Sequence, residues 1–197
     1  MFRALKWLKQ ECVVTKDYET LCSASHVIFP GVGAAGDAMF HLKRTGLDRV
    51  IIQLAREGKP LLGICLGTQI IFDFSEENTT PCLGILPGTV KRFPEDLMSS
   101  GALLKIPHMG WNSVSFRTNH PVFRGISDHA EFYFVHSFFP RPDSEEYVLG
   151  TTSYGIEFPS AVGAANVVAV QFHPEKSGRP GLAILENFCG WRGTDAE

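Results

Sequence analysis

Several features are scarce in this 197-residue sequence, and each absence excludes a class of protein. Basic residues are not in excess, since 18 Lys and Arg stand against 21 Asp and Glu, whereas nucleic-acid binders usually carry a clustered basic patch. The longest apolar stretch, residues 60–72, is short and is interrupted by Thr68 and Gln69, so the sequence predicts no membrane-spanning helix. The 19 glycines and 12 prolines follow no period, which excludes a collagen-like or low-complexity chain.

The cysteines and the first residues also lack the patterns of a secreted protein. The five cysteines include no Cys-x-x-Cys pair, and the opening residues MFRALKWLKQE alternate apolar and charged side chains, unlike the core of a signal peptide. Four histidines have no metal-ligand spacing; they are His26, His41, His120 and His129. Because 44% of the residues are hydrophobic, the chain can bury a core. We expect a globular cytoplasmic protein with reduced thiols that folds as one domain over residues 1–197.

The order of the predicted elements indicates an α/β fold. In the first half we expect helices over 2–11, 36–57 (interrupted at Gly46) and 66–77, and β-strands over 12–15, 26–29 and 60–64. In the second half we expect short β-runs near 85–93, 102–106, 111–116, 131–139, 146–152, 160–164 and 167–172, then a helix over 180–191. This order predicts a doubly wound, mostly parallel sheet with helices on both faces and antiparallel additions in the second half.

A candidate nucleophile lies between a predicted strand and a predicted helix. Cys65 is flanked by Gly63 and Gly67 in the segment GICLG, which has the form of a nucleophile elbow. A cysteine at a helix N-terminus feels the positive end of the helix dipole, which favours the thiolate. The N–H of Leu66 would then point at an oxyanion formed on the group under attack. The alternative is an inert core cysteine, but the two glycines and the strand–turn–helix context favour the nucleophile.

A candidate base and its orienting group follow the β-run 167–172. In extended backbone, residues two apart face the same side, so Glu175 can orient the ring of His173. Pro174 restricts the backbone between them and favours that geometry. Alone, His-Pro-Glu is more often a turn than a catalytic pair. Together with Cys65, it supplies the base that a cysteine nucleophile requires.

The segment Gly31–Gly36 matches the pattern G-x-G-x-x-G and raises the alternative of a dinucleotide site. That site also needs an acidic residue at the end of the next strand, and Cys65 occupies that position instead. We therefore expect the loop to present backbone N–H groups to an oxyanion or an anionic substrate.

The segment 107–112, PHMGWN, gathers large and polar side chains in one short stretch. One interpretation is a structural turn with Trp111 in the core. The other is a partner surface, because tryptophan is frequent among interface hot spots. The candidate interface residues are His108, Met109, Trp111 and Asn112.

With these residues in place, the chain resembles the class I glutamine amidotransferases. The resemblance extends over nearly the whole chain and is carried by FPGVGAAGDAM (29–39), GKPLLGICLGTQIIF (58–72), IPHMGWNSV (106–114), FYFVHSFF (132–139) and VQFHPEKSG (170–178). It implies glutamine hydrolysis without a metal or organic cofactor, by a triad of Cys65, His173 and Glu175. The residues that it implies for the oxyanion and the substrate are Gly31, Val32, Gly33, Leu66, Gln69, His136 and Ser137.

The resemblance also implies a partner. Within the class, the chain is most similar to glutaminase subunits that pass ammonia to a cyclase with a (β/α)₈ barrel in histidine biosynthesis, and segment 107–112 is similar to their cyclase-facing stretch. A related subunit feeding another synthase and a non-catalytic remnant remain alternatives. An α/β-hydrolase is disfavoured, because there the acid precedes a distant final histidine, whereas Glu175 follows His173.

One departure concerns the start of the chain. Members of the family begin with a strand and a loop that lead into the first helix, whereas Met1 here falls inside that helix. We expect the family's first strand, an interior strand of the sheet, to be missing, so that backbone groups of its neighbours are left unpaired.

Overall fold

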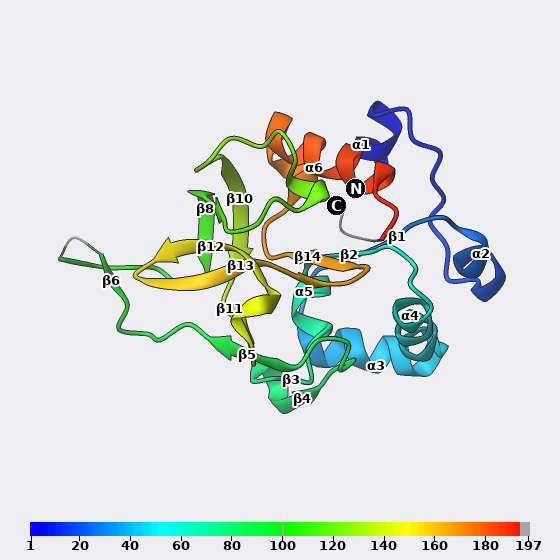
Figure 1. Cartoon of the computed structure of the whole chain (residues 1–197). Helices are drawn as coiled ribbons and strands as arrows, with labels where there is room; N and C mark the ends of the chain where they lie inside the picture. The colour runs from blue at the N-terminus through cyan, green and yellow to red at the C-terminus, as the bar shows by residue number, and fades with distance from the viewer. Residues whose placement is uncertain (100, 194–197) are drawn as a thin grey trace.

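A six-stranded sheet forms the centre of the protein in the computed structural model, which describes residues 1–99 and 101–193 (Figure 1). In spatial order its strands are β1 (Val27–Gly31), β2 (Leu61–Cys65), β14 (Val167–Val170), β13 (Ile156–Ala164), β12 (Val148–Tyr154) and β9 (Ser115–Phe116). The first three strands are parallel, and the other three extend the sheet in antiparallel fashion. The predicted α/β fold with antiparallel additions in the second half is confirmed.

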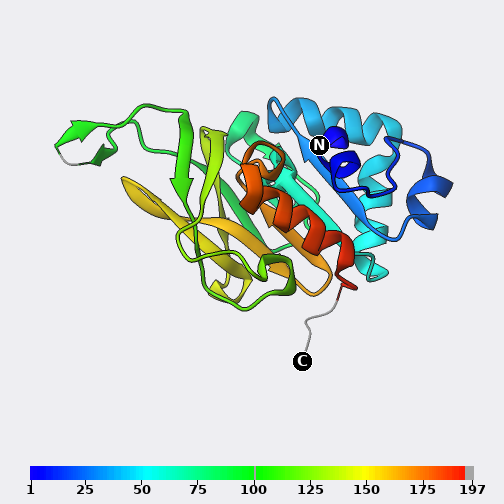
Figure 2. The ribbon, with the colours of Figure 1, turned by 90° about the horizontal axis from the view of Figure 1, so that it is seen from above.

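Helices cover both faces of this sheet (Figure 2). The α-helices are α1 (Phe2–Trp7), α2 (Tyr18–Ser23), α3 (Ala35–Thr45), α4 (Leu47–Arg56), α5 (Leu66–Ile70) and α6 (Gly178–Gly190). The short 3-10 turns are η1 (Glu77–Thr79), η2 (Pro121–Phe123), η3 (Glu145–Tyr147) and η4 (Pro174–Lys176). Helices α1 and α6 pack on one face, and α3, α4 and α5 pack on the other.

Smaller sheets flank the central one. One has the order β11 (Phe138–Pro142), β5 (Gly88–Arg92), β3 (Phe74–Ser75) and β4 (Thr80–Pro81). The others are the antiparallel pairs of β8 (His108–Ser113) with β10 (Glu131–His136) and of β6 (Met98–Ser99) with β7 (Ala102–Leu103). The pairing of β8 with β10 places His108 opposite His136.

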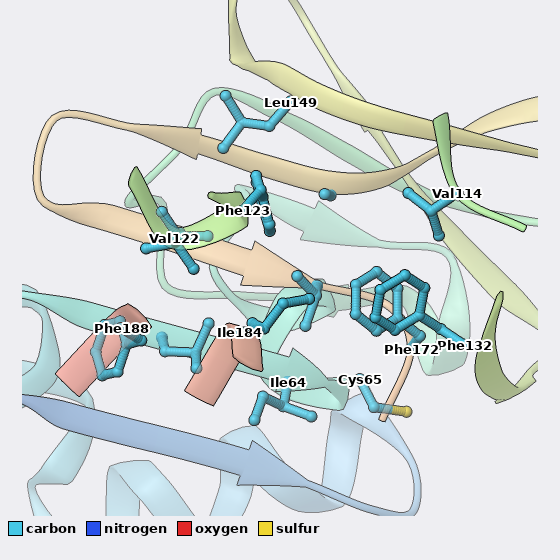
Figure 3. Close-up of a cluster of buried hydrophobic side chains, with 14 of the residues drawn as sticks. Ile64, Cys65, Val114, Val122, Phe123, Phe132, Leu149, Phe172, Ile184 and Phe188 are labelled. Carbon is cyan, nitrogen blue, oxygen red and sulfur yellow. The ribbon is translucent and has the colours of Figure 1, made fainter. Parts of the chain in front are cut away.

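Two hydrophobic clusters hold these layers together. The cluster beneath α6 is rich in aromatic side chains, including Phe132, Phe172 and Phe188 (Figure 3). The cluster on the opposite face packs α3 and α4 against the aliphatic side chains of the sheet. All five residues of β2 are buried, because a parallel strand covered on both faces has no solvent side. This explains the continuous apolar run of β2, which ends at Cys65.

Two helices are shorter than the sequence predicts. Helix α1 ends at Trp7 rather than residue 11, because Lys9 adopts a left-handed φ of 58° and the N–H of Gln10 bonds back to the carbonyl of Leu5. Helix α5 ends at Ile70 rather than residue 77. The carbonyls of residues 70–72 accept hydrogen bonds from the N–H groups of residues 83–86, so they are not used to continue the helix.

The run 12–15 forms no strand, which corrects the prediction for that segment. A strand needs a neighbour to take its backbone hydrogen bonds. Strand β1 lies at one edge of the central sheet, and within residues 1–99 and 101–193 only β2 pairs with it. The other predicted strands, the break between α3 and α4 at Gly46 and the final helix are present, with altered ends. Within the described ranges, no helix has the length and apolar character needed to cross a membrane.

Candidate active site

Cys65 lies at a sharp turn between β2 and α5, where the parallel strands of the sheet end. Figure 3 shows its sulfur at the end of β2, directed away from the hydrophobic cluster. Its backbone has φ 54° and ψ −107°, a conformation that costs free energy for any residue with a Cβ atom. A Cβ atom at Gly67 would overlap the carbonyl oxygen of Phe29, and one at Gly63 would lie 3.0 Å from the Gly67 backbone. The two flanking glycines are therefore required by the close packing of this turn.

His173 and Glu175 lie at the end of β14, the strand next to β2. The Nδ1 atom of His173 is 3.0 Å from Oε1 of Glu175. The backbone of His173 is fixed by its N–H bond to the carbonyl of Tyr133 and by the Ser177 hydroxyl, which donates to its carbonyl at 2.6 Å. Its other ring nitrogen, Nε2, is buried without a hydrogen-bond partner among the described residues. One nitrogen is thus oriented by a carboxylate, and the other is free to exchange a proton.

The electrostatic surroundings of His173 favour its charged form. Burial alone would lower its pKa, but the side chains of Cys65 and Glu175 outweigh burial and raise the pKa to about 9. Burial would raise the pKa of Glu175, yet its hydrogen bond to His173 and the charge on that ring hold it below the usual value. A ring that is cationic at neutral pH carries the proton that a leaving group would need.

Two glutamines connect Cys65 to the start of β11. Gln69 of α5 donates through Nε2 to the carbonyl of Phe138 at 3.0 Å and to Oε1 of Gln171 at 3.2 Å. The Nε2 atom of Gln171 lies 3.9 Å from Sγ of Cys65. The carbonyl of Val135 lies 4.0 Å from Sγ of Cys65, and the carbonyl of Phe138 accepts from Gln69, so the segment that holds the predicted substrate residues His136 and Ser137 runs beside the candidate nucleophile and Gln69. Gln171 was not anticipated, because nothing in its local sequence relates it to Cys65.

The loop that follows β1 lies alongside Cys65 and Leu66. Gly31 is paired with Cys65 in the sheet, and a Cβ atom on Gly31 would lie 2.8 Å from Cβ of Leu66, so only glycine allows this approach. Val32 is largely exposed, and Gly33 has a φ of 94°. The structure thus brings this loop and Leu66 together beside the candidate nucleophile.

Glu77 is a site neighbour that the sequence did not indicate. Its Oε2 atom accepts a hydrogen bond of 2.7 Å from the N–H of Ala35, at the first turn of α3. The contact joins residues 42 positions apart, so no local pattern could have predicted it. A dinucleotide phosphate bound at the start of α3 would meet this carboxylate, which further disfavours a dinucleotide site.

The candidate interface residues divide between the two faces of β8. Met109 and Trp111 are 61% and 55% exposed, so Trp111 is not a core residue. His108 is buried, in contrast to its predicted place on a partner surface, and Asn112 is half-buried. Side chains alternate across a strand, so the even-numbered residues of β8 face the protein and the odd-numbered ones face outward.

The five cysteines are free thiols in the structure. Across residues 1–99 and 101–193, no group of three or more His, Cys, Asp or Glu side chains is arranged to hold a metal ion.

Comparison with known proteins places the chain in a family. The family described as Glutamine amidotransferase class-I matches residues 5–190. The chain belongs to this family. Imidazole glycerol phosphate synthase subunit HisH of Nitratidesulfovibrio vulgaris strain DP4 is 52% identical to it over 187 residues, which cover 94% of this chain and 87% of that protein. The subunits of the same name from Maridesulfovibrio salexigens and Aromatoleum aromaticum are 48% and 49% identical, and cover 94% and 90% of this chain and 88% and 84% of their own.

Solved structures share the fold. A crystal structure of a glutamine amidotransferase superimposes with a TM-score of 0.70 at 22% identity, and the match covers 95% of this chain and 91% of that one. The glutaminase domain of Trypanosoma brucei CTPS with bound acivicin gives a TM-score of 0.61 at 16% identity, covering 98% and 88%. The central sheet and its flanking helices are thus the fold of this family.

Proposed function

We propose that this chain is the glutaminase subunit of an imidazole glycerol phosphate synthase and acts in histidine biosynthesis, with Cys65 as its nucleophile. The observation that carries the proposal is the arrangement at the ends of β2 and β14. There a strained Cys65 adjoins His173, whose ring is held at 3.0 Å by Glu175. The relatives that share about half of their residues with this chain over most of its length bear the name of that subunit.

The reaction follows from the roles of these three side chains. The thiolate of Cys65 attacks the carboxamide carbon of glutamine, and His173 gives its proton to the nitrogen, which leaves as ammonia. Water then attacks the resulting thioester while His173 takes up its proton as the base, which releases glutamate and restores the thiolate and the protonated ring. Glu175 orients the ring and stabilises its charge throughout.

Backbone N–H groups stabilise the oxyanion of both steps. The donors are the N–H of Leu66 and one from the loop of Gly31, Val32 and Gly33, which the sheet holds beside Leu66. The loss of one such donor typically costs about 10²–10³ in rate. The amino-acid end of glutamine is held by Gln69 and by the backbone at His136 and Ser137, on the side of Cys65 where these residues gather.

The ammonia passes to a partner. Ammonia released into neutral water is mostly protonated and no longer a nucleophile, so the subunit docks on a cyclase with a (β/α)₈ barrel as a heterodimer in the cytoplasm. The cyclase uses the ammonia to make imidazole glycerol phosphate and an aminoimidazole carboxamide ribotide. The exposed Met109 and Trp111 provide an apolar anchor for this contact.

The test is the release of glutamate from glutamine, with and without a purified cyclase and its ligand. We expect activity that rises with the cyclase and falls by about 10⁴-fold or more in Cys65→Ala. Cys22→Ala, a half-buried cysteine of α2, is the matched control and should retain activity. Activity that survives in Cys65→Ala would contradict the mechanism. Activity that responds only to another synthase would support the alternative acceptor.

A further inference from the structure

A chain of hydrogen bonds with two buried histidines at its centre runs from β8 through the end of β10 to the start of β11. The Nδ1 atom of His136 is 2.8 Å from the carbonyl oxygen of Phe138, and its Nε2 atom is 2.9 Å from Nδ1 of His108. The Nε2 atom of His108 is in turn 3.2 Å from Nδ2 of Asn112, which also donates to the carbonyl of Ser153 at 2.9 Å. The two rings lie in register across the β8–β10 pair.

The groups at the two ends of this hydrogen-bond chain determine the direction in which hydrogens are donated along it. A carbonyl only accepts, so Nδ1 of His136 must carry a hydrogen, and a neutral ring then has a lone pair on Nε2. That lone pair requires a hydrogen on Nδ1 of His108, whose Nε2 must in turn accept from the amide of Asn112. Asn112 is oriented independently, because its Oδ1 accepts from the N–H of Ser113. Donation therefore runs from Asn112 to His108, then to His136 and to the carbonyl of Phe138.

Two aromatic rings fix the plane of the His108 imidazole, so that both of its nitrogens point at their hydrogen-bond partners. It stacks on Phe134 and on Tyr154, with centroid distances of 4.8 and 4.1 Å and interplanar angles of 26° and 27°. Apolar side chains could fill this aromatic environment without needing hydrogen-bond partners. A buried network of polar side chains is retained where it specifies the geometry of its members. The histidines thus fix positions that apolar packing alone would leave loose.

The two ends of this hydrogen-bond chain lie at different sites, one on the outward-facing strand β8 and the other beside the candidate glutamine site. At one end, the backbone of β8 carries exposed Met109 and Trp111 on its outer face. At the other, the Phe138 carbonyl that accepts from His136 also accepts from Gln69, which bonds to Gln171 beside Cys65. One carbonyl is therefore shared by the histidine chain and by the wall of the candidate glutamine site.

We propose that His108 and Asn112 are positioning residues, which tie the partner-facing strand β8 to the glutamine site through His136, the Phe138 carbonyl and Gln69. The proposal rests on the proposed function, since it assigns a glutamine site and a partner to this chain. A shift of β8 on docking at Met109 and Trp111 changes the hydrogen bonds of the same strand's inner face, and this relay carries the change to Gln69.

The direction of the relay can be measured without a variant. In protein labelled with ¹⁵N-histidine, the ring nitrogens of His108 and His136 should both show the Nδ1–H tautomer at neutral pH. An Nε2–H tautomer or a charged ring at His108 would overturn the relay, because either state changes the direction or the partners of donation. A merely space-filling pair of histidines has no reason to share this tautomer.

Glutamine binding tests the positioning role, and it is measured by calorimetry on a Cys65→Ala background so that turnover plays no part. Adding His108→Phe should raise the Kd for glutamine about tenfold, because His136 loses its donor and can release the Phe138 carbonyl. Adding His108→Asn should restore most of the affinity, since its amide supplies the donor near the position of Nδ1. His41→Phe, on the exposed surface of α3, is the matched control and should leave the Kd unchanged.

A second variant covers the case in which His108→Phe fails to fold. Asn112→Ala removes the donor to His108 at a half-buried position, and should raise the Kd by about threefold while the protein still melts cooperatively. The relay alone would be overturned if His108→Phe and Asn112→Ala both left the Kd for glutamine unchanged from that of Cys65→Ala. It would also be overturned if His108→Asn bound glutamine no more tightly than His108→Phe. A Cys65→Ala protein that binds no glutamine would instead contradict the proposed function.

Discussion

Three buried histidines occupy one region of the protein, and their surroundings shift their pKa values in opposite directions. His173 is 3% exposed, His108 is 2% exposed and His136 is 5% exposed, so burial does not distinguish them. Burial lowers the pKa of His108 to about 4 and, with the nearby charges of His108 and His173, lowers that of His136 to about 3. The side chains of Cys65 and Glu175 raise that of His173 to about 9.

The difference comes from what each ring contacts. His173 lies beside the side chain of Cys65 and has the carboxylate of Glu175 on its Nδ1 side, whereas His108 and His136 contact each other, an amide and a carbonyl. Acidic neighbours stabilise the buried charge of His173 enough to outweigh burial. The hydrogen bond from His136 to the carbonyl of Phe138 also raises the pKa of that ring, but by less than burial lowers it. One region can therefore hold the proton that the proposed mechanism needs, while the adjacent pair stays neutral at neutral pH, as the proposed relay requires.

Removing the acidic partner should have the largest effect on this contrast. In Glu175→Gln, His173 loses the carboxylate that orients it, and we expect kcat/KM for glutamine to fall by about 10²–10⁴-fold. The pKa of the His173 ring should also fall toward those of the other two, which a ¹⁵N titration would record. Glu76→Gln, an exposed carboxylate paired with Lys91, is the matched control and should keep wild-type activity. An unchanged His173 titration in Glu175→Gln would contradict this account of the contrast.

The arrangement of the His173 site could be predicted from the sequence because it depends on local patterns. A strand, two glycines and a helix predict the turn at Cys65, and the spacing of two residues places Glu175 beside His173. Both relations act over a few residues, where backbone geometry alone decides which side chains meet. Alternation of elements likewise predicted the sheet.

The second region could not be predicted, since its contacts join distant segments. The burial of His108 follows from the pairing of β8 with β10 and from Tyr154 of β12. The contact of Glu77 with Ala35 and the early end of α5 likewise depend on where later loops return. In such cases tertiary contacts take the hydrogen bonds that a local pattern assigns to a helix or a surface.

The two regions should also produce opposite pH dependences of stability. The folded-state pKa of His173 is raised, so its contribution is complete below pH about 6.5 and is lost as the pH rises toward 9. His108 and His136 have lowered pKa values, so the unfolded chain takes up protons first and stability is lost as the pH falls from about 6.5 toward 4. Between pH 5 and 9, urea unfolding should show a maximum near pH 6.5, with each side falling by on the order of 3 kcal/mol.

Two variants test the acid and the alkaline parts of this pH–stability profile separately. His173→Gln should flatten mainly the alkaline side, because it removes the only one of the three rings whose pKa is raised. Its effect on the acid side should be smaller, since the charge of His173 is only a minor cause of the lowered pKa of His136. His108→Asn should reduce the slope of the acid side by about half, since one of two depressed groups remains. If His173→Gln changed the acid side between pH 5 and 6.5 as strongly as the alkaline side, the assignment of opposite shifts to the two regions would be wrong.

The smallest expected effect is the coupling energy of an exposed ion pair, which shows how much burial contributes to the contrast between the histidines. Glu76 accepts from Lys91 at 2.8 Å, slightly closer than the 3.0 Å between Glu175 and His173, but the two side chains are 41% and 36% exposed. Water and salt screen such a pair, so a double-mutant cycle of Glu76→Gln and Lys91→Met should give a coupling of about 0.2–1 kcal/mol in unfolding experiments. The coupling should nearly vanish in 1 M salt, where the Debye length is about 3 Å. A coupling of about 3 kcal/mol that salt does not reduce would mean that contact distance, rather than burial with an acidic neighbour, separates His173 from the other histidines.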